Sequence, residues 1–222
     1  MTTKVDIWVD PVCPFAWMTA QWLLEVEKVR DVEAQFNVMS LAYLNDGREG
    51  LSDDYRKMMQ NSWGPVRVLT AVEQQYGKKG LRDFYLKLAT MRHNEKRGFS
   101  HRAYEQALEA VGLDPALAEK AEDSSLDEAL KESHHRGMDA VGNDVGTPVI
   151  HFPRPDGGIS AFFGPVITPP PTGEEAGRLW DGLEVVATTD GLYELKRSRD
   201  RSPEFLPMEE GTTAPELEAD VV

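Results

Sequence analysis

Cys13 is the only cysteine among 222 residues, and its neighbours make it the residue best suited to do chemistry. The motif Cys13-Pro14-Phe15-Ala16 follows a short apolar run, Val5 to Val9, and opens a stretch with helical spacing. Proline fits the first turn of a helix, and the free N–H groups of that turn stabilise an anion. Thiols at such positions have pKa values of roughly 3.5–7.5. We therefore predict a reactive, exposed thiolate at Cys13; the alternative is a small, buried core residue.

Ala16 stands where a dithiol motif carries its second cysteine. Without a second thiol, Cys13 has no internal partner to release a mixed disulfide. Any disulfide cycle is then monothiol: Cys13 joins a small thiol or a substrate, and an external thiol releases it. A single cysteine also excludes an intramolecular disulfide framework and a Cys-rich zinc site.

The elements around Cys13 predict a βαβ unit. Val5 to Val9 has the pattern of a strand, and the residues from Pro14 to about Arg30 have that of a helix. Val32 to Leu44 returns to a β-like pattern. Two strands joined through a helix run parallel, with a right-handed crossover.

Several short amphipathic helices are predicted between about Ser52 and about Val141. Their N-terminal signals are Ser52, Ser100, Asp114-Pro115 and a resemblance to a capping box in Ser124-Ser125-Leu126-Asp127. Glycines separate the predicted helices: Gly64, Gly77, Gly80, Gly98 and Gly112.

The last third of the chain returns to β patterns. Val149 to Phe152 and Ile159 to Phe163 are joined by a turn rich in proline and glycine, which predicts a hairpin. Glu174 to Ala187 predicts a closing helix. Pro203 to Val222 has six acidic residues and no Lys or Arg, so we predict that it is disordered.

This order of elements predicts an α/β protein with a thioredoxin-like fold and a large all-helical insertion. We assign residues 1–45 and 145–200 to the thioredoxin-like domain, 46–144 to the insertion and 203–222 to an acidic tail. In thioredoxin-like proteins a cis-proline before the third strand lies beside the reactive cysteine, and Pro148 occupies that place.

Composition excludes several function classes. With 24 Lys and Arg against 38 Asp and Glu, the formal charge is −14, which disfavours broad binding to nucleic acid or to anionic membranes. No apolar run reaches membrane-spanning length, and no secretory signal is visible. We expect a cytoplasmic protein, where a lone thiol stays reduced.

Several segments together resemble the mycothiol-dependent nitroreductases of actinobacteria, in the DsbA-like branch of the thioredoxin superfamily. Counting residues 144 to 148 as one segment, there are eight: Asp10-Pro11-Val12-Cys13-Pro14-Phe15-Ala16-Trp17, Val38-Met39-Ser40-Leu41, Trp63-Gly64-Pro65-Val66-Arg67, Ser133-His134-His135, Gly137-Met138-Asp139-Ala140-Val141-Gly142, Asp144-Val145-Gly146-Thr147-Pro148, Phe162-Phe163-Gly164-Pro165 and Glu194-Leu195-Lys196-Arg197. The similarity runs from about Val5 to about Phe205.

The resemblance implies a cytoplasmic homodimer that uses mycothiol as cosubstrate to reduce disulfides or activated small molecules, with no tightly bound cofactor. It implies Cys13 as nucleophile and Pro148 as the cis-proline, preceded by Thr147, whose backbone holds the partner molecule. The family motif is usually Cys-Pro-Trp-Cys, so Phe15 and Ala16 depart from it.

Three further positions match residues that line the pocket of this family. Asn45 is expected to bind a polar cosubstrate, Tyr55 to stack or donate its hydroxyl, and His93 to stabilise the thiolate or carry a proton. The alternatives are a turn residue at Asn45 and a packing residue at Tyr55.

The remaining chemical groups have plainer interpretations. His134 and His135 are adjacent, so a helix would point them about 100° apart, and we expect packing or capping and no metal site. His101 is expected at the surface and His151 in packing, while Lys196 to Arg199 is expected to be a solvated face.

Three functions remain open at this point. The leading one is a mycothiol-dependent oxidoreductase in which Cys13 forms a mixed disulfide. The second is an enzyme like the kappa-type glutathione transferases and chromene-carboxylate isomerases, which orients a cosubstrate thiol without disulfide exchange. The third is a non-catalytic binding module that keeps the fold and an unused thiol.

Overall fold

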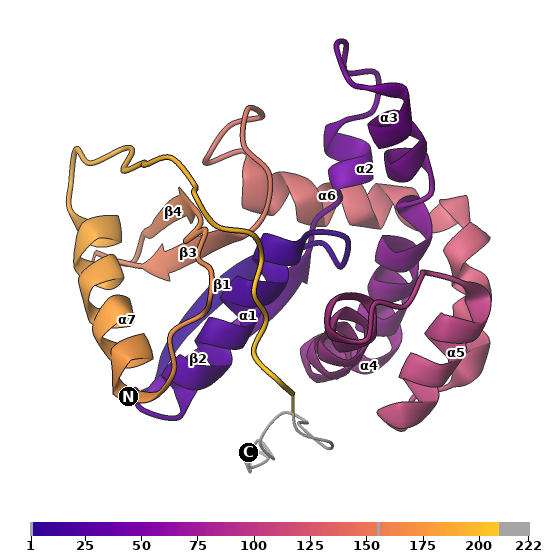
Figure 1. Cartoon of the computed structure of the whole chain (residues 1–222), viewed down its shortest axis with the longest axis horizontal. Helices are drawn as coiled ribbons and strands as arrows, with labels where there is room; N and C mark the ends of the chain where they lie inside the picture. The colour runs from indigo at the N-terminus through magenta and orange to yellow at the C-terminus, as the bar shows by residue number, and fades with distance from the viewer. Residues whose placement is uncertain (1, 155, 209–222) are drawn as a thin grey trace.

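The computed structural model describes residues 2–154 and 156–208, and these contain one four-stranded sheet (Figure 1). The strands stand in the order β2-β1-β3-β4, with bounds β1 Thr3–Val9, β2 Val32–Val38, β3 Val149–Pro153 and β4 Ile159–Phe163. β1 runs parallel to β2 and antiparallel to β3, which forms a hairpin with β4. The predicted βαβ unit and hairpin are therefore confirmed.

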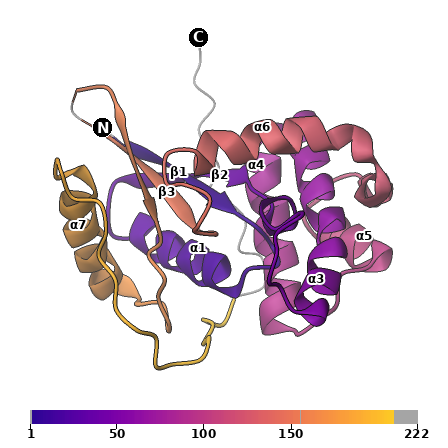
Figure 2. The same ribbon diagram turned by 90° about the horizontal axis from the view of Figure 1, so that it is seen from above.

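Helices cover both faces of the sheet (Figures 1 and 2). On one face lie α1 (Pro14–Glu27) and α7 (Gly173–Thr188), where Phe152 of β3 contacts Trp180 with ring centroids 5.5 Å apart. α6 (Asp127–Met138) crosses the other face, where the Trp8 indole N–H donates to the Ser133 carbonyl at 2.8 Å. Alternate residues of a strand point to opposite faces, which is why apolar residues occur on both.

The helical insertion lies to one side of the sheet, next to its edge strand β2 (Figures 1 and 2). It follows the short helix α2 (Leu41–Leu44), and its elements are α3 (Asp53–Gln60), α4 (Trp63–Ala89), a π-helical turn (Thr90–Asn94), α5 (His101–Ala110), two 3₁₀ segments (Pro115–Glu122 and Ser124–Leu126) and α6. α4 packs on β2 and α6 returns the chain to the sheet. The predicted α/β architecture with an all-helical insertion is confirmed.

Most of the predicted helix starts are confirmed by side-chain bonds. The Ser52 hydroxyl accepts the backbone N–H of Tyr55 at 3.3 Å, and the Ser100 hydroxyl accepts that of Ala103 at 3.2 Å. Asp114 Oδ1 accepts the N–H of Ala116 at 2.9 Å. The capping box is wrong: Asp123 caps the short 3₁₀ segment, and α6 has no side-chain cap. The Asp123 carboxylate accepts both the backbone N–H and the hydroxyl of Ser125, so this hydroxyl is engaged away from α6.

The glycine boundaries are only partly correct. Gly64 and Gly80 lie inside α4, where helical packing overrides their low helix propensity. Gly77 interrupts α4 with a φ of 67°, a conformation that favours glycine. Gly98 and Gly112 lie outside the helices, as predicted.

Disorder was predicted from residue 203, and this is wrong for residues 203–208. Phe205 contacts the His93 ring at 5.4 Å between centroids, and the Leu206 carbonyl accepts hydrogen bonds from Gln21 and Asn94. The three apolar residues of this segment supply contacts that its acidic composition does not reveal. Residues 209–222 lie outside the described part of the chain.

No helix within residues 2–154 and 156–208 is both long and apolar enough to cross a bilayer.

Gly137 gives a test of how α6 packs on the sheet. A Cβ at this position would overlap the Trp8 ring, so we expect Gly137→Ala to lower the free energy of unfolding by about 1–3 kcal/mol through overpacking. Gly182→Ala is the matched control, because α7 leaves open space there and alanine favours the helix by up to about 1 kcal/mol. Urea denaturation measures both variants. Equal stabilisation by the two substitutions would contradict this packing.

Candidate active site

Cys13 is the N-terminal cap of α1. Its backbone is extended (φ −82°, ψ 115°), and its Sγ accepts the N–H of Ala16 at 3.4 Å. Pro14 occupies the first helical position, where no N–H is needed. The local sequence thus places the sulfur at the positive end of the helix, as its motif predicts.

A segment 134 residues further along the chain closes on the same sulfur. The Cys13 thiol donates to the Thr147 carbonyl at 3.2 Å, and the following peptide bond, Thr147–Pro148, is cis. The Thr147 hydroxyl donates to the Trp8 carbonyl at 2.6 Å, which ties this turn to the end of β1. Because β1 and β3 are neighbours in the sheet, the start of β3 lies beside the end of β1. The predicted pairing of Cys13 with Thr147-Pro148 is therefore present.

The thiol is not the exposed anion that the motif predicts. Cys13 is only 9% exposed, and burial, the largest cause, raises its pKa to about 11. The N–H of Ala16 and the charge of Arg199 lower the pKa, while the charge of Asp10 raises it. Desolvation outweighs the helix N-terminus, so in this conformation Cys13 is a protonated hydrogen-bond donor.

Asp10 is a fully buried carboxyl group beside the thiol. Its two oxygens accept the N–H of Val12 at 2.8 Å and that of Leu41 at 2.7 Å. Burial raises its pKa to about 6, against the lowering effect of these two bonds. Asp10 therefore links the start of α2 with the turn that contains Cys13.

His93 reaches the same turn from the π-helical segment of the insertion. Its Nε2 lies 2.9 Å from the Pro11 carbonyl, which only accepts, so Nε2 carries the proton. Burial lowers the pKa of His93 to about 4, so the ring is neutral at physiological pH and Nδ1 is an acceptor. This state opposes both predicted roles of His93, because a neutral ring brings no positive charge to the thiolate and a lowered pKa disfavours proton uptake.

Asn45 and Tyr55 come from α2 and α3. Asn45 is buried at the C-terminal cap of α2, and its side-chain amide donates to the Leu41 carbonyl at 2.8 Å. Burial, then the charges of Cys13 and Asp10, raise the pKa of Tyr55, which places its phenol within electrostatic reach of the thiol. This bond within the turn fits the alternative interpretation of Asn45 as a turn residue. Asn45 ends α2, whose first residue, Leu41, is bonded to Asp10.

Two residues of this region were not identified from the sequence. Tyr85 is fully buried, and its hydroxyl has no hydrogen-bond partner in the described part of the protein. Burial raises the pKa of Tyr85 well above its ordinary value, and the charges of Cys13 and Asp10 raise it further. Arg199, predicted to be a solvated cation, places its guanidinium carbon 4.7 Å from the centre of the Phe15 ring. Helical periodicity could have indicated a buried Tyr85, but no sequence signal connects Arg199 to Phe15.

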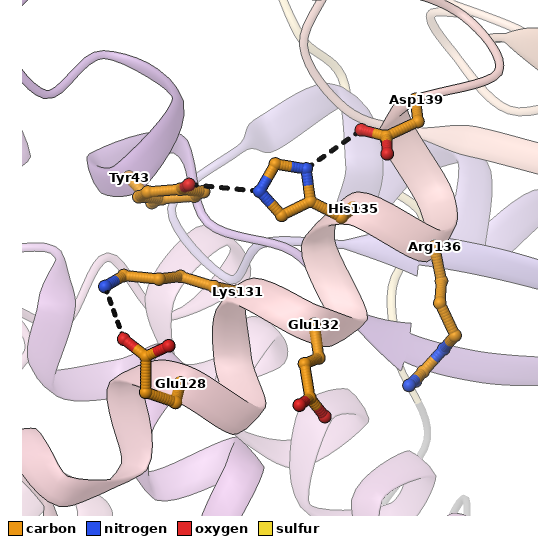
Figure 3. A pocket seen from close by; sticks show the side chains of 7 residues that line it. All are labelled: Tyr43, Glu128, Lys131, Glu132, His135, Arg136 and Asp139. Carbon is orange, nitrogen blue, oxygen red and sulfur yellow. Dashed lines mark hydrogen bonds and ion pairs between the residues drawn. The ribbon is translucent and has the colours of Figure 1, made fainter.

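A cavity of about 690 Å³ lies away from Cys13, between α2 and α6. Its lining residues are Tyr43, Glu128, Lys131, Glu132, His135, Arg136 and Asp139 (Figure 3). The Tyr43 hydroxyl, the His135 ring and the Asp139 carboxylate form a chain of hydrogen bonds of 3.1 and 2.9 Å (Figure 3). The bond between Tyr43 and His135 joins α2 to α6. Cys13 is not among the residues that line this cavity.

The other histidines have structural roles, as predicted. His134 is buried and its Nδ1 accepts from Ser40 N at 3.3 Å, while His151 packs on Trp8 with ring centroids 4.3 Å apart. His101 is exposed. The residues that the structure describes contain no cluster of three or more His, Cys, Asp or Glu able to hold a metal ion.

Titration of the thiol tests this electrostatic balance. We expect the ultraviolet absorbance of the thiolate to rise with a midpoint near pH 11 in the folded protein, above the ordinary value of 9.0. Because the folded state favours the thiol, this group contributes stability below pH 9 that is lost as the pH rises toward 11.

Asp10→Asn removes the opposing charge, so we expect it to lower the Cys13 pKa, with about ten times more thiolate for each unit of decrease. Asp190→Asn, on an exposed turn, is the control and should leave the midpoint unchanged. A midpoint below pH 8 in the unmodified protein would show that Cys13 is an anion after all.

Comparison with known proteins gives the chain a family. The family model described as Rv2466c-like, mycothiol-dependent nitroreductase Rv2466c, matches residues 12–197. An uncharacterised protein of Mycobacterium tuberculosis, Rv2286c, is 26% identical over 200 residues, which cover 89% of this chain and 83% of that protein.

Two solved structures have the same fold at 16% identity. A 2-hydroxychromene-2-carboxylate isomerase matches 82% of this chain and 93% of its own with a TM-score of 0.54. The cytosolic disulfide reductase DsbM of Pseudomonas aeruginosa matches 81% of this chain and 98% of its own with a TM-score of 0.53. The predicted thioredoxin-like fold with a helical insertion is confirmed. Because this family model matches residues 12–197, most of the chain, the chain belongs to the family of Rv2466c-like mycothiol-dependent nitroreductases.

Proposed function

We propose that the protein is a cytoplasmic, homodimeric thiol oxidoreductase that uses mycothiol as cosubstrate in a monothiol cycle. The observation that carries this proposal is the position of Cys13 Sγ between the N–H of Ala16 and the carbonyl of Thr147, at 3.4 and 3.2 Å. Membership of the mycothiol-dependent family supports the choice of cosubstrate. In this proposal the domain of residues 1–45 and 145–200 carries the thiol, and the insertion of residues 46–144 covers it.

The cycle needs two exchanges at one sulfur. The Cys13 thiolate attacks one sulfur of a disulfide, the S–S bond breaks, and the other sulfur leaves as a thiolate. The thiolate of mycothiol then attacks the mixed disulfide, which frees Cys13 and carries the bound sulfur away in a new disulfide. The peptide of Thr147, fixed by Pro148, would hold the partner molecule by strand-like hydrogen bonds.

Proton removal is the step that the burial of Cys13 makes demanding. His93 is a poor acceptor for this proton, because burial lowers its pKa to about 4 while the pKa of the thiol is about 11, so the proton leaves to solvent. We assign His93 as a residue that holds the loop before Cys13 through the Pro11 carbonyl, Tyr55 as a wall of the site and Asn45 as the C-terminal cap of α2. Once the proton is gone, the N–H of Ala16 and the charge of Arg199 favour the thiolate.

A second candidate function rests on the protonated state of the thiol. Cys13 donates its S–H and has a raised pKa, and Ala16 removes the resolving thiol. Such a group could orient the thiolate of a cosubstrate by a hydrogen bond, as a transferase or isomerase of this fold would require. No mixed disulfide would then form.

Cys13→Ser separates the two candidates. We expect oxidised mycothiol to form one mixed disulfide with the unmodified protein, seen by intact mass spectrometry, and none with the variant. Mycothiol-dependent reductase turnover should disappear, since a hydroxyl is not oxidised to a disulfide. Full retention of turnover would contradict the oxidoreductase and favour the second candidate, in which a hydroxyl also donates.

Ala16→Cys tests whether the missing second thiol determines the cycle. Ala16 is fully buried in the first turn of α1, three residues after Cys13. We expect the variant to form an internal disulfide and to accumulate no mycothiol adduct, measured by mass spectrometry. The control is Ala20→Cys, because its buried position seven residues after Cys13 is about 10 Å along the helix and beyond disulfide reach. A stable mycothiol adduct in Ala16→Cys would contradict this explanation.

A further inference from the structure

The C-terminal strap, which we define as residues 192–208, returns from α7 and crosses α1 without helix or strand (Figures 1 and 2). Leu206 fixes its far end. The side chain of Gln21 donates to the Leu206 carbonyl at 2.8 Å and accepts its N–H at 3.1 Å. The amide of Asn94 donates to the same carbonyl at 2.7 Å. The strap is therefore held to both α1 and the π-helical turn, the two elements that flank Cys13.

A second pair of bonds fixes the strap nearer its middle. The Thr168 hydroxyl donates to the Ser202 carbonyl at 3.0 Å and accepts the N–H of Glu204 at 3.0 Å. Arg199 precedes this anchor and lies over Phe15, while Phe205 follows it and contacts His93. Both aromatic contacts are made to residues of the predicted site. The strap thus forms a wall of that site.

Arg199 is the positively charged residue of the strap that lies beside the site. Its guanidinium carbon lies over the Phe15 ring, 4.7 Å from the ring centre. It makes no ion pair with another residue that the structure describes. A stacked guanidinium keeps its N–H edge free, and that fork matches a carboxylate with two parallel hydrogen bonds. The charge also reaches the sulfur, where it favours the thiolate.

Arg199 carries a positive charge in a chain whose formal charge is −14, and Asp10 is buried nearby. A net negative charge opposes the approach of anions, and a local cation offsets that repulsion. Arg199 lies over Phe15, the third residue of the motif Cys13-Pro14-Phe15-Ala16.

We propose that Arg199 is a specificity-determining residue, which selects carboxylate-bearing small molecules for reaction at Cys13. This inference deepens the proposed function, since it names the substrate class of the same site. The carboxylate binds the edge of the guanidinium, and the reactive bond of the substrate faces the sulfur. Phe15 keeps the guanidinium in place by stacking.

The test uses two aromatic disulfides that differ in charge. Dithiobis-nitrobenzoate carries a carboxylate on each ring, and dithiodipyridine is neutral at the assay pH. With either probe the Cys13 thiolate attacks one sulfur, the S–S bond breaks and the second aromatic thiolate leaves, which its absorbance reports. The ratio of the two second-order rate constants measures selectivity for the carboxylate and cancels any change in thiolate population.

We expect Arg199→Gln to lower this ratio by about tenfold, the effect of one lost charge-assisted hydrogen bond. Arg199→Lys should restore part of it, and added salt should lower the ratio in the unmodified protein. Arg197→Gln, which removes the same charge from the same basic run, is the matched control and should leave the ratio unchanged.

Two results would overturn the inference. A ratio that Arg199→Gln leaves unchanged, with both probes slowed equally or not at all, means that Arg199 selects no anion. Absence of reaction with both probes means that the site admits no such molecule. No mycothiol or turnover enters the measurement, so failure of the proposed mycothiol cycle would appear in the adduct experiment and leave this ratio intact.

Discussion

One sulfur atom connects the βαβ unit before the helical insertion with the β-hairpin that follows it. Cys13 Sγ takes an N–H from the first turn of α1 and gives its own proton to the carbonyl of Thr147, before a cis-proline. This contact exists because β1 lies between β2 and β3, so the turn after β1 and the turn before β3 meet at one edge. The helical insertion can be long without disturbing the contact, since it leaves and rejoins the sheet at this edge.

Two opposing effects determine the state of that sulfur. The helix N-terminus and Arg199 favour the anion, while burial and the charge of Asp10 favour the thiol, and burial is the largest effect. A helix dipole is worth only about 0.3–1 kcal/mol at an exposed site, and the loss of hydration by a buried charge costs several kcal/mol. Reactivity at Cys13 therefore depends on what approaches it and on which groups accept its proton.

The insertion and the C-terminal strap supply most of the groups around the thiol. α3 brings Tyr55, the π-helical turn brings His93 and Asn94, and the strap brings Arg199 and Phe205. A π turn adds one residue to the helical repeat and so changes which side chains face inward, a feature common at functional sites. Here two adjacent residues of that turn contact the loop before α1 and the strap.

The sequence by itself determined the order of the elements, the place of Cys13 at a strand-to-helix turn and the family. These follow from hydrophobic periodicity, capping residues and local motifs, which act over a few neighbouring positions. The tertiary structure alone decided that Cys13 is buried and protonated, that the Tyr85 hydroxyl has no hydrogen-bond partner among the described residues and that Arg199 lies on Phe15. Exposure and pairing depend on contacts between residues far apart in the chain, and for Arg199 and Phe15 no spacing or composition encodes that meeting.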